Sequence, residues 1–228
     1  MVNSLHVIVF AKAPVAGLAK TRLIPALGAR GAARLAVSML GHAVEQALAS
    51  GAGTVEVCAT PAPQDPMWSG LLPRPPNLRV SDQGQGDLGE RMARAAQRVL
   101  NAGRPVLLMG TDCPDLSAER IRTAADGLRT CDAAIVPAFD GGYVLLALNQ
   151  FDASLFQEIA WSTSSVAEVT QSRIQQLGWR LTTLPTLHDI DEPDDLRWLP
   201  ANWLPTAKES SSGSASQANR PDAARKLK

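Results

Sequence analysis

The chain has 228 residues, 45% of them hydrophobic and 19% charged, which suits one sizeable globular domain and is too short for two large ones. Its 22 basic and 22 acidic residues give a net charge of zero, so no global field attracts it to nucleic acid or to a membrane. The three cysteines, Cys58, Cys113 and Cys131, form no CxxC pair, and their odd number argues against a disulfide framework. We therefore expect a cytoplasmic protein with no signal peptide and no apolar stretch of membrane-spanning length.

Strand and helix patterns alternate along most of the chain. The first expected strand, 5–11, is apolar and rich in β-branched residues, as is typical of a strand buried on both faces of a parallel sheet. Further strands are expected at 54–60, 78–81, 105–109, 133–137, 143–148 and 179–184, and helices at 29–48, 89–100, 118–128 and 166–177. This alternation predicts an α/β fold, a three-layer sandwich with a mostly parallel central sheet, in a single domain over 1–204. The segment 205–228 has few apolar residues, so we expect a disordered polar tail there.

The loop FAKAPVAGLAKTRL, residues 10–23, follows the first expected strand. It carries three cations and a glycine: Lys12, Gly17, Lys20 and Arg22. Ligands of open α/β sheets lie at the carboxyl ends of strands, where backbone amides and cations can hold phosphates. The loop therefore predicts a nucleotide phosphate site, the alternative being an ordinary solvated loop. A P-loop is excluded, because Pro14 and Ala19 stand at the two glycine positions of GxxxxGK[ST].

The motif LLMGTDCPDL, residues 107–116, presents carboxylates directly after a buried strand. Asp112 at that strand end is well placed to hold Mg²⁺ on substrate phosphates. Asp115 fits a turn or helix cap ahead of Ser117 better than it fits a metal site. Cys113 is interpreted as a small buried residue and not as a nucleophile, because no histidine lies nearby in sequence.

The motif FDGGYVLLAL, residues 139–148, contains a glycine pair that lets the backbone bend sharply or approach a ligand closely. Asp140 at this bend is a candidate site residue. The alternative is an Asp-Gly hairpin turn with no role in binding.

The motif HDIDEPDDL, residues 188–196, supplies Asp189 and Asp191 shortly before an expected helix near Pro193. A second carboxylate from elsewhere in the chain is needed to complete a metal site, because one aspartate rarely fixes Mg²⁺ alone. The spacing from Asp191 to Asp194 also suits helix capping. We expect His188 to be packed or hydrogen-bonded, and not bound to a metal.

Two weaker motifs complete the pattern. GDLGERM, residues 86–92, has acids at helix-start spacing that predict a capping box, although Arg91 within it can reach a substrate anion. WSTSSV, residues 161–166, offers Trp161 as an aromatic wall and hydroxyls for an acceptor pocket. Its Ser165 also matches a capping box with Glu168.

Taken in order, the motifs FAKAPVAGLAKTRL, GDLGERM, GTDCPDL, DGGYVLLAL, WSTSSV and DIDEPDDL resemble the nucleotide-diphospho-sugar transferase superfamily, the GT-A fold, over about 5–199. More narrowly, they resemble a bacterial family usually labelled glycosyltransferase and linked by name to arsenosugar biosynthesis. AKTRLIPALGARGAARLAVSML is similar to the opening of phospholactate guanylyltransferase. The chain departs from the molybdenum-cofactor guanylyltransferases, whose first loop has a double glycine where this chain reads APVAG, and this departure leaves the base and the acceptor open.

The resemblance implies a metal-dependent transferase that uses a nucleotide, an NTP or an NDP-sugar, and a small-molecule acceptor. In such relatives the aspartate of an Asp-x-Pro element and a later aspartate beside a proline and an acidic pair hold Mg²⁺ (or Mn²⁺), which maps onto Asp112 and Asp191. The expected catalytic residues are Lys12, Lys20, Arg22 and Asp112. The expected substrate-binding residues are Ala11, Gly17, Thr111, Asp140, Gly141, Gly142, Tyr143 and Trp161.

The leading hypothesis for the reaction is nucleotidyl transfer from an NTP to a small phosphorylated acceptor. Three cations near one site favour a triphosphate, and this chemistry relies on positioning and charge neutralisation instead of a strong general base. Glycosyl transfer from an NDP-sugar is the alternative, and an inert nucleotide-binding regulatory module is a third possibility. No nucleic-acid or membrane partner is expected.

Overall fold

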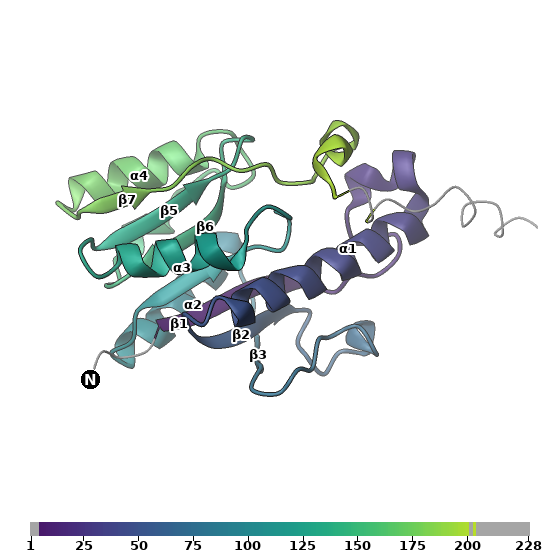
Figure 1. The fold of residues 1–228 in the computed structure, drawn as a ribbon, viewed down its shortest axis with the longest axis horizontal. Helices are drawn as coiled ribbons and strands as arrows, with labels where there is room; N and C mark the ends of the chain where they lie inside the picture. Colours follow the sequence, from purple (N-terminus) through teal and green to yellow (C-terminus); the bar gives the residue numbers. More distant parts are fainter. Residues whose placement is uncertain (1–4, 201–202, 204–228) are drawn as a thin grey trace, which may run out of the picture.

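A seven-stranded sheet forms the centre of the computed structural model, which describes residues 5–200 and residue 203 (Figure 1). The strand order is β3-β2-β1-β4-β6-β5-β7, and every neighbouring pair is parallel except the two pairs made by β6. The strands are β1 (Leu5–Lys12), β2 (Gly53–Thr60), β3 (Arg79–Asp82), β4 (Val106–Met109), β5 (Ala133–Pro137), β6 (Tyr143–Leu148) and β7 (Leu181–Thr183). The helices are α1 (Ile24–Ala49), α2 (Leu88–Asn101), α3 (Ala118–Gly127) and α4 (Val166–Gln176). Four short 3-10 helices are η1 (Thr21–Leu23), η2 (Pro66–Trp68), η3 (Ala153–Leu155) and η4 (Pro193–Trp198).

The sheet is covered on both faces, as its apolar strands require. Val7 and Val9 of β1 enter one core together with apolar residues of α1 and α3. Ile8, which points to the other face, enters a second core with residues of α2 and α4. The predicted three-layer α/β sandwich with a mostly parallel sheet is therefore confirmed.

Helix α1 is the longest helix in the fold and is interrupted near its start. Gly28 has φ 69° and ψ 161°, so a short first segment precedes the main helix, which begins at Ala29 as predicted. The stretch Thr21–Ala49 is long and apolar enough to cross a membrane by length and composition alone, contrary to the expectation from sequence. In this structure α1 packs along β1, β2 and α3, and core helices of soluble proteins meet the same criterion, so this is weak evidence for a membrane span.

The carboxyl ends of the parallel strands meet at one edge of the sheet. Because β6 is antiparallel to β4 and β5, its first residue, Tyr143, lies at this same edge. After β7 the chain returns along the edge through backbone hydrogen bonds, from Leu187 N to Pro137 O and from Ile190 N to Asp112 O at 2.8 Å. These bonds bring the late acidic segment beside the end of β4.

The largest departures from the predicted elements lie near the end of the fold. β7 is shorter than expected, and the helix expected near Pro193 is the 3-10 helix η4. The expected polar tail, 205–228, lies outside the described residues, and the single domain over 1–204 stays a prediction.

Candidate functional site

Lys20 reaches across the carboxyl edge of the sheet and connects the basic loop to both acidic motifs. Its backbone has φ 47° and ψ 47°, a left-handed conformation immediately before η1. Its Nζ lies 2.5 Å from Oδ1 of Asp112 and 2.7 Å from Oδ1 of Asp191, and it also donates to the Ile190 carbonyl at 2.6 Å. The Lys20 side chain is only 9% exposed, whereas the carboxylates are 46% and 41% exposed. One buried cation therefore joins two half-open carboxylates that are far apart in sequence.

The pKa of Lys20 is raised from its ordinary value. Burial alone lowers the pKa of an ammonium, but the charges and hydrogen bonds of Asp112 and Asp191 outweigh that effect. Lys20 is therefore charged at neutral pH.

The donor chemistry at Asp112 and Asp191 fits a divalent metal ion. Each carboxylate uses Oδ1 for Lys20, and within residues 5–200 no hydrogen bond occupies either Oδ2. Mg²⁺ is commonly held by one or two carboxylates together with substrate phosphates, and not by a complete protein cage. The described residues contain no group of three or more histidines, cysteines and acids that could hold a metal ion.

Three further cations surround this pair. Lys12, at the end of β1, is exposed and makes no hydrogen bond or ion pair with the described part of the chain. Arg22 is 63% exposed and lies 3.3 Å from Glu192. Arg91 of α2 donates from Nε to the Gly86 carbonyl at 2.8 Å, and its Nη1 makes two longer contacts of 3.5 Å, with Thr60 Oγ1 and Gln83 Oε1.

These residues line one cavity of about 530 Å³, which we call the basic cavity. It lies beside the ends of β1, β2 and β4, and its lining includes most of the predicted phosphate and metal residues: Ala11, Lys12, Lys20, Arg22, Thr111, Asp112, Asp140 and Asp191. The structure thus brings predicted residues of all four motifs to one place, while their roles stay predictions.

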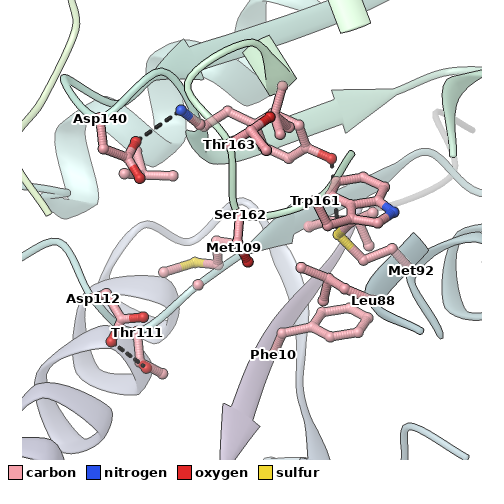
Figure 2. Close-up of a pocket in the computed structure, with 16 residues that line it drawn as sticks. Phe10, Leu88, Met92, Met109, Thr111, Asp112, Asp140, Trp161, Ser162 and Thr163 are labelled. Carbon is pink, nitrogen blue, oxygen red and sulfur yellow. Dashed lines mark hydrogen bonds between the residues drawn. The ribbon is translucent and has the colours of Figure 1, made fainter. Parts of the chain in front are cut away.

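A second cavity, of about 290 Å³, adjoins the first over the ends of β4 and β6; we call it the apolar cavity (Figure 2). Figure 2 shows Trp161, Met92, Leu88 and Phe10 grouped at one end, with Thr111 and Asp112 at the other. Predicted substrate-binding residues in its lining are Thr111, Asp140, Gly142, Tyr143 and Trp161. The hydroxyl of Tyr143 lies 3.8 Å from Met92 Sδ, and burial raises the Tyr143 pKa well above its ordinary range, so the phenol stays neutral.

Asp140 makes the predicted turn and also lines the cavities, while its role in binding stays a prediction. Its Oδ1 accepts a hydrogen bond from Gly142 N at 2.7 Å, which makes the local turn. The same residue lines both cavities and also a small hollow of about 110 Å³ that it shares with Asp189. Burial raises the pKa of Asp189 to about 6, and the charges of Asp140 and Asp191 add to this shift.

Two predicted substrate-binding glycines line neither cavity and serve the backbone instead. Gly17 has φ 84° in the turn of the basic loop. Gly141 has φ 89°, and a Cβ there would come within 2.0 Å of the Ser164 carbonyl oxygen. Gly141 therefore allows the bend after β5 to contact the segment that carries Trp161.

The capping predictions had mixed outcomes. Asp87 and Glu90 form the expected capping box of α2. Ser165 precedes α4 but makes no capping hydrogen bond, so that prediction is wrong, because its backbone is already helical with ψ −3°. At η4 the capping acid is Asp195, whose Oδ2 accepts from Asp191 N and Glu192 N, which leaves the Asp191 side chain for Lys20.

Asp115, which the sequence assigned to a turn or cap, is exposed and lines neither cavity. The cap of α3 is Ser117, whose hydroxyl accepts from Arg120 N. Asp115 contributes its carbonyl, which accepts from Ser117 N and from the Arg120 guanidinium. The turn role is thus carried by backbone atoms.

Cys113 and His188 occupy structural positions, as the sequence indicated. Cys113 is buried, and burial raises its pKa to about 12, so its thiol is not a nucleophile at neutral pH. The His188 ring stacks between Phe139 and Trp198, with centroids 4.0 Å from each. No histidine within the described residues lines either cavity.

Sequence reasoning missed several residues that shape the site. Gln83 is buried and donates to the carbonyls of Cys58 and Ala11, which fixes the β3–α2 connection against β1 and β2. Phe10, Leu88 and Met92 line the apolar cavity, but in the sequence they look like ordinary core positions. No sequence signal marks them, because their role depends on how α2 meets the end of β1.

Solved structures with the same fold are known, and three of them are described as transferases or a synthetase. A crystal structure from Desulfovibrio desulfuricans G20, described as a "putative nucleotide-diphospho-sugar transferase", aligns with a TM-score of 0.80 and 30% identity, over 92% of each chain. A nucleotidyl transferase from Methanothermobacter thermautotroptrophicus shares the fold, with a TM-score of 0.56 and 17% identity over 89% of this chain and 98% of that one. So does CMP:2-keto-3-deoxy-manno-octonic acid synthetase complexed with CTP, with a TM-score of 0.52 and 13% identity over 86% and 96%. The chain thus has the nucleotide-diphospho-sugar transferase fold.

Within this class, residues 43–163 match the model of a family described as "Uncharacterized protein conserved in bacteria (DUF2064)", and the chain belongs to that family. Among curated proteins no relative matches the chain.

Proposed function

We propose that this protein is a metal-dependent transferase that carries out nucleotidyl transfer from a nucleoside triphosphate to a small phosphorylated acceptor. The observation that carries the proposal is the convergence of Asp112 and Asp191 on Lys20 inside a cavity lined by further cations. The resemblance of the basic loop to phospholactate guanylyltransferase supports the same reaction, as do a nucleotidyl transferase and a CTP-bound synthetase of the same fold.

The charge balance of the basic cavity supports a metal ion as part of the substrate. Four of the lining residues are cationic (Lys12, Lys20, Arg22 and Arg91), and three are carboxylates (Asp112, Asp140 and Asp191). The protein alone therefore offers a net charge of +1, which is little against the several negative charges of a triphosphate. Mg²⁺ or Mn²⁺ held by Asp112 and Asp191 would supply the missing positive charge and polarise the α-phosphate of the triphosphate, where the acceptor attacks.

Each protein group has a proposed role that follows from its position. Lys12 and Arg91 bind phosphate oxygens, because both line the cavity, Lys12 makes no bond with the described chain, and the Nη1 of Arg91 makes only 3.5 Å contacts. Lys20 orients the two carboxylates and holds their charge in place. Nucleotidyl transfer to an anionic acceptor needs no strong general base, which agrees with the stacked, non-catalytic position of His188.

Glycosyl transfer from an NDP-sugar is the second candidate, favoured by the description of the Desulfovibrio relative. The two reactions release different products. Purified protein is incubated with MgCl₂, each of the four common triphosphates or their NDP-sugars, and a panel of phosphorylated acceptors, and pyrophosphate and nucleoside diphosphate are measured separately. We expect acceptor-dependent pyrophosphate release from one triphosphate. Diphosphate release from an NDP-sugar alone would overturn the nucleotidyl proposal in favour of the second.

A further inference from the structure

The apolar cavity differs in chemistry from the basic cavity that it adjoins. Among residues 5–200, no lysine, arginine or histidine lines it. Its lining includes five large apolar residues, which we call its apolar wall: Phe10, Leu88, Met92, Trp161 and Val166. A phosphate or a sugar placed against this wall would lose water without gaining charge-assisted partners.

The segment that carries Trp161 contacts two glycines closely, Gly89 of α2 and Gly141 in the bend after β5. At Gly89 an added Cβ would lie 2.6 Å from Trp161 Nε1 and 2.3 Å from the Phe156 carbonyl oxygen. At Gly141 the bend after β5 lies equally close to Ser164, and Ala167 N donates to the Gly141 carbonyl at 2.8 Å. Trp161 is therefore half-buried against α2 and forms part of the cavity lining.

The two cavities meet at a polar boundary. Thr111, Asp112, Asp140 and Ser162 line both of them, together with Phe10 and Leu88. A molecule that fills the apolar cavity would present one end at Asp112, beside the proposed metal-bound phosphates. That is where an acceptor oxygen must lie to react.

Resting on the function proposed above, we infer that the apolar cavity is the acceptor subsite and that it selects an acceptor with a compact apolar body. The body is aromatic or branched aliphatic and carries its reacting oxygen at one end. The cavity volume of about 290 Å³ is at the small end of ligand sites, which limits the body to roughly the size of one ring with short substituents. This inference excludes a sugar as the part of the acceptor held in this cavity.

Four probes measure the contributions of the apolar body and of the anionic group to binding separately: benzyl phosphate, benzyl alcohol, glucose 1-phosphate and glucose. Binding of each to the full chain is measured by calorimetry in MgCl₂. We expect benzyl phosphate to bind at least about tenfold more tightly than glucose 1-phosphate, because the ring is removed from water against Trp161 and Met92. Benzyl alcohol should in turn bind more tightly than glucose. Equal or tighter binding of the glucose compounds would overturn the inference.

Two variants with matched controls locate the binding. Trp161→Ala is paired with Trp179→Ala as its control. Both tryptophans are partly buried and pack against the core that lies between the sheet and α2 and α4, but Trp179 lines neither cavity. Leu88→Ser is paired with Val37→Ser, because these side chains are 43% and 38% exposed and tolerate a polar replacement. Both cavity variants should weaken benzyl phosphate binding by about threefold to tenfold, and their affinity for glucose 1-phosphate should not change. Both control variants should bind all four probes like wild type. Unchanged affinity in Leu88→Ser, which keeps its fold, would overturn the inference even if Trp161→Ala fails to fold.

Failure of this inference is distinguishable from failure of the proposed function. If the apolar cavity is not the acceptor subsite, triphosphates still bind in the presence of Mg²⁺, but the ring gives no advantage. If the protein does not use a nucleotide, triphosphates do not bind, whatever the probes show.

Discussion

Asp112 and Asp191 share one partner, because their Oδ1 atoms lie 2.5 and 2.7 Å from Nζ of Lys20. The ammonium is buried, while both carboxylates open into the basic cavity. Lys20 thus keeps two like charges together that would otherwise repel each other. In the metal site proposed above, these two carboxylates would be the oxygen ligands, and a metal ion would compete with Lys20 for them.

Removing this shared partner should destabilise the fold and increase the response to metal. We expect Lys20→Met to lower the free energy of unfolding by about 2 kcal/mol, since each half-exposed carboxylate loses its counter-charge. Mg²⁺ should then raise the melting temperature of the variant more than that of wild type, because both carboxylates are freed. Urea unfolding and melts with and without MgCl₂ measure these effects, and Lys12→Met, which removes an unpaired lysine, is the control for stability. A variant that gains no more from Mg²⁺ than wild type does would show that Lys20 does not compete with Mg²⁺ for the two carboxylates.

Lys12 should matter for binding and not for stability. It is exposed and makes no bond to the described chain, yet it lines the basic cavity. We expect Lys12→Ala to weaken binding of the magnesium–triphosphate complex about tenfold and to reduce the dependence of binding on salt. Calorimetry at two salt concentrations measures both. Arg34→Ala, an exposed cation of α1 outside both cavities, should bind like wild type, and equal losses in the two variants would mean that the effect is general electrostatics.

Gly141 and Gly41 should respond to alanine with opposite signs. At Gly141 a side chain meets both a φ of 89° and the Ser164 backbone, so Gly141→Ala should lower the free energy of unfolding by about 2 kcal/mol or more. At Gly41, within α1, an added Cβ meets nothing within 4 Å, so Gly41→Ala should raise it by about 0.5–1 kcal/mol. Urea denaturation compares the two. A stable Gly141→Ala protein would show that the turn does not need to approach the Trp161 segment.

Glu56 should give the protein a pH-dependent contribution to stability. Burial of this carboxyl raises its pKa, but contacts with His6, Arg98 and Ser81 outweigh burial and bring the pKa down to about 2. Arg98 contributes a 2.5 Å ion pair, whereas His6 Nε2 approaches to 2.8 Å without the direction of a regular hydrogen bond. A lowered folded-state pKa adds stability above the unfolded value of 4.5, and this stability is lost as the pH falls from about 4.5 towards 2.

Glu56→Gln should therefore be about 2 kcal/mol less stable than wild type at pH 7. The difference should shrink as the pH falls from about 4.5 towards 2, and denaturant unfolding at a series of pH values measures it. A constant difference across this range would mean that the charge of Glu56 does not stabilise the fold.

The sequence predicted the elements well where apolar periodicity is strong. The strand 5–11 and the helix 89–100 lie within one residue of β1 and α2 at each end. The late helix was harder, because its capping acid is Asp195 and not Asp191, and several acids in a row leave the choice open. The contact with Lys20, which is distant in sequence, occupies the Asp191 side chain and leaves Asp195 to cap η4.

The candidate site was predictable only in part. The acids and cations stand out because polar residues directly follow apolar strands. The ion pair of Lys20 was not predicted, since it depends on a left-handed backbone at Lys20 and on the return of the chain from β7 along the sheet edge. The polar side of the apolar cavity was indicated by Thr111, Asp140 and the Gly142–Tyr143 bend, but of its apolar wall only Trp161 was predicted, because Met92 and Phe10 have the same pattern as core residues.

Calorimetric titration of ATP, GTP, CTP and UTP into wild type and Asp112→Asn, with and without MgCl₂, tests the central claim most directly. We predict that one triphosphate binds wild type at least about tenfold more tightly with Mg²⁺ than without it, and that Asp112→Asn loses this gain while its fold is retained. Binding that is independent of Mg²⁺, or a metal-dependent gain that persists in Asp112→Asn, would contradict the account.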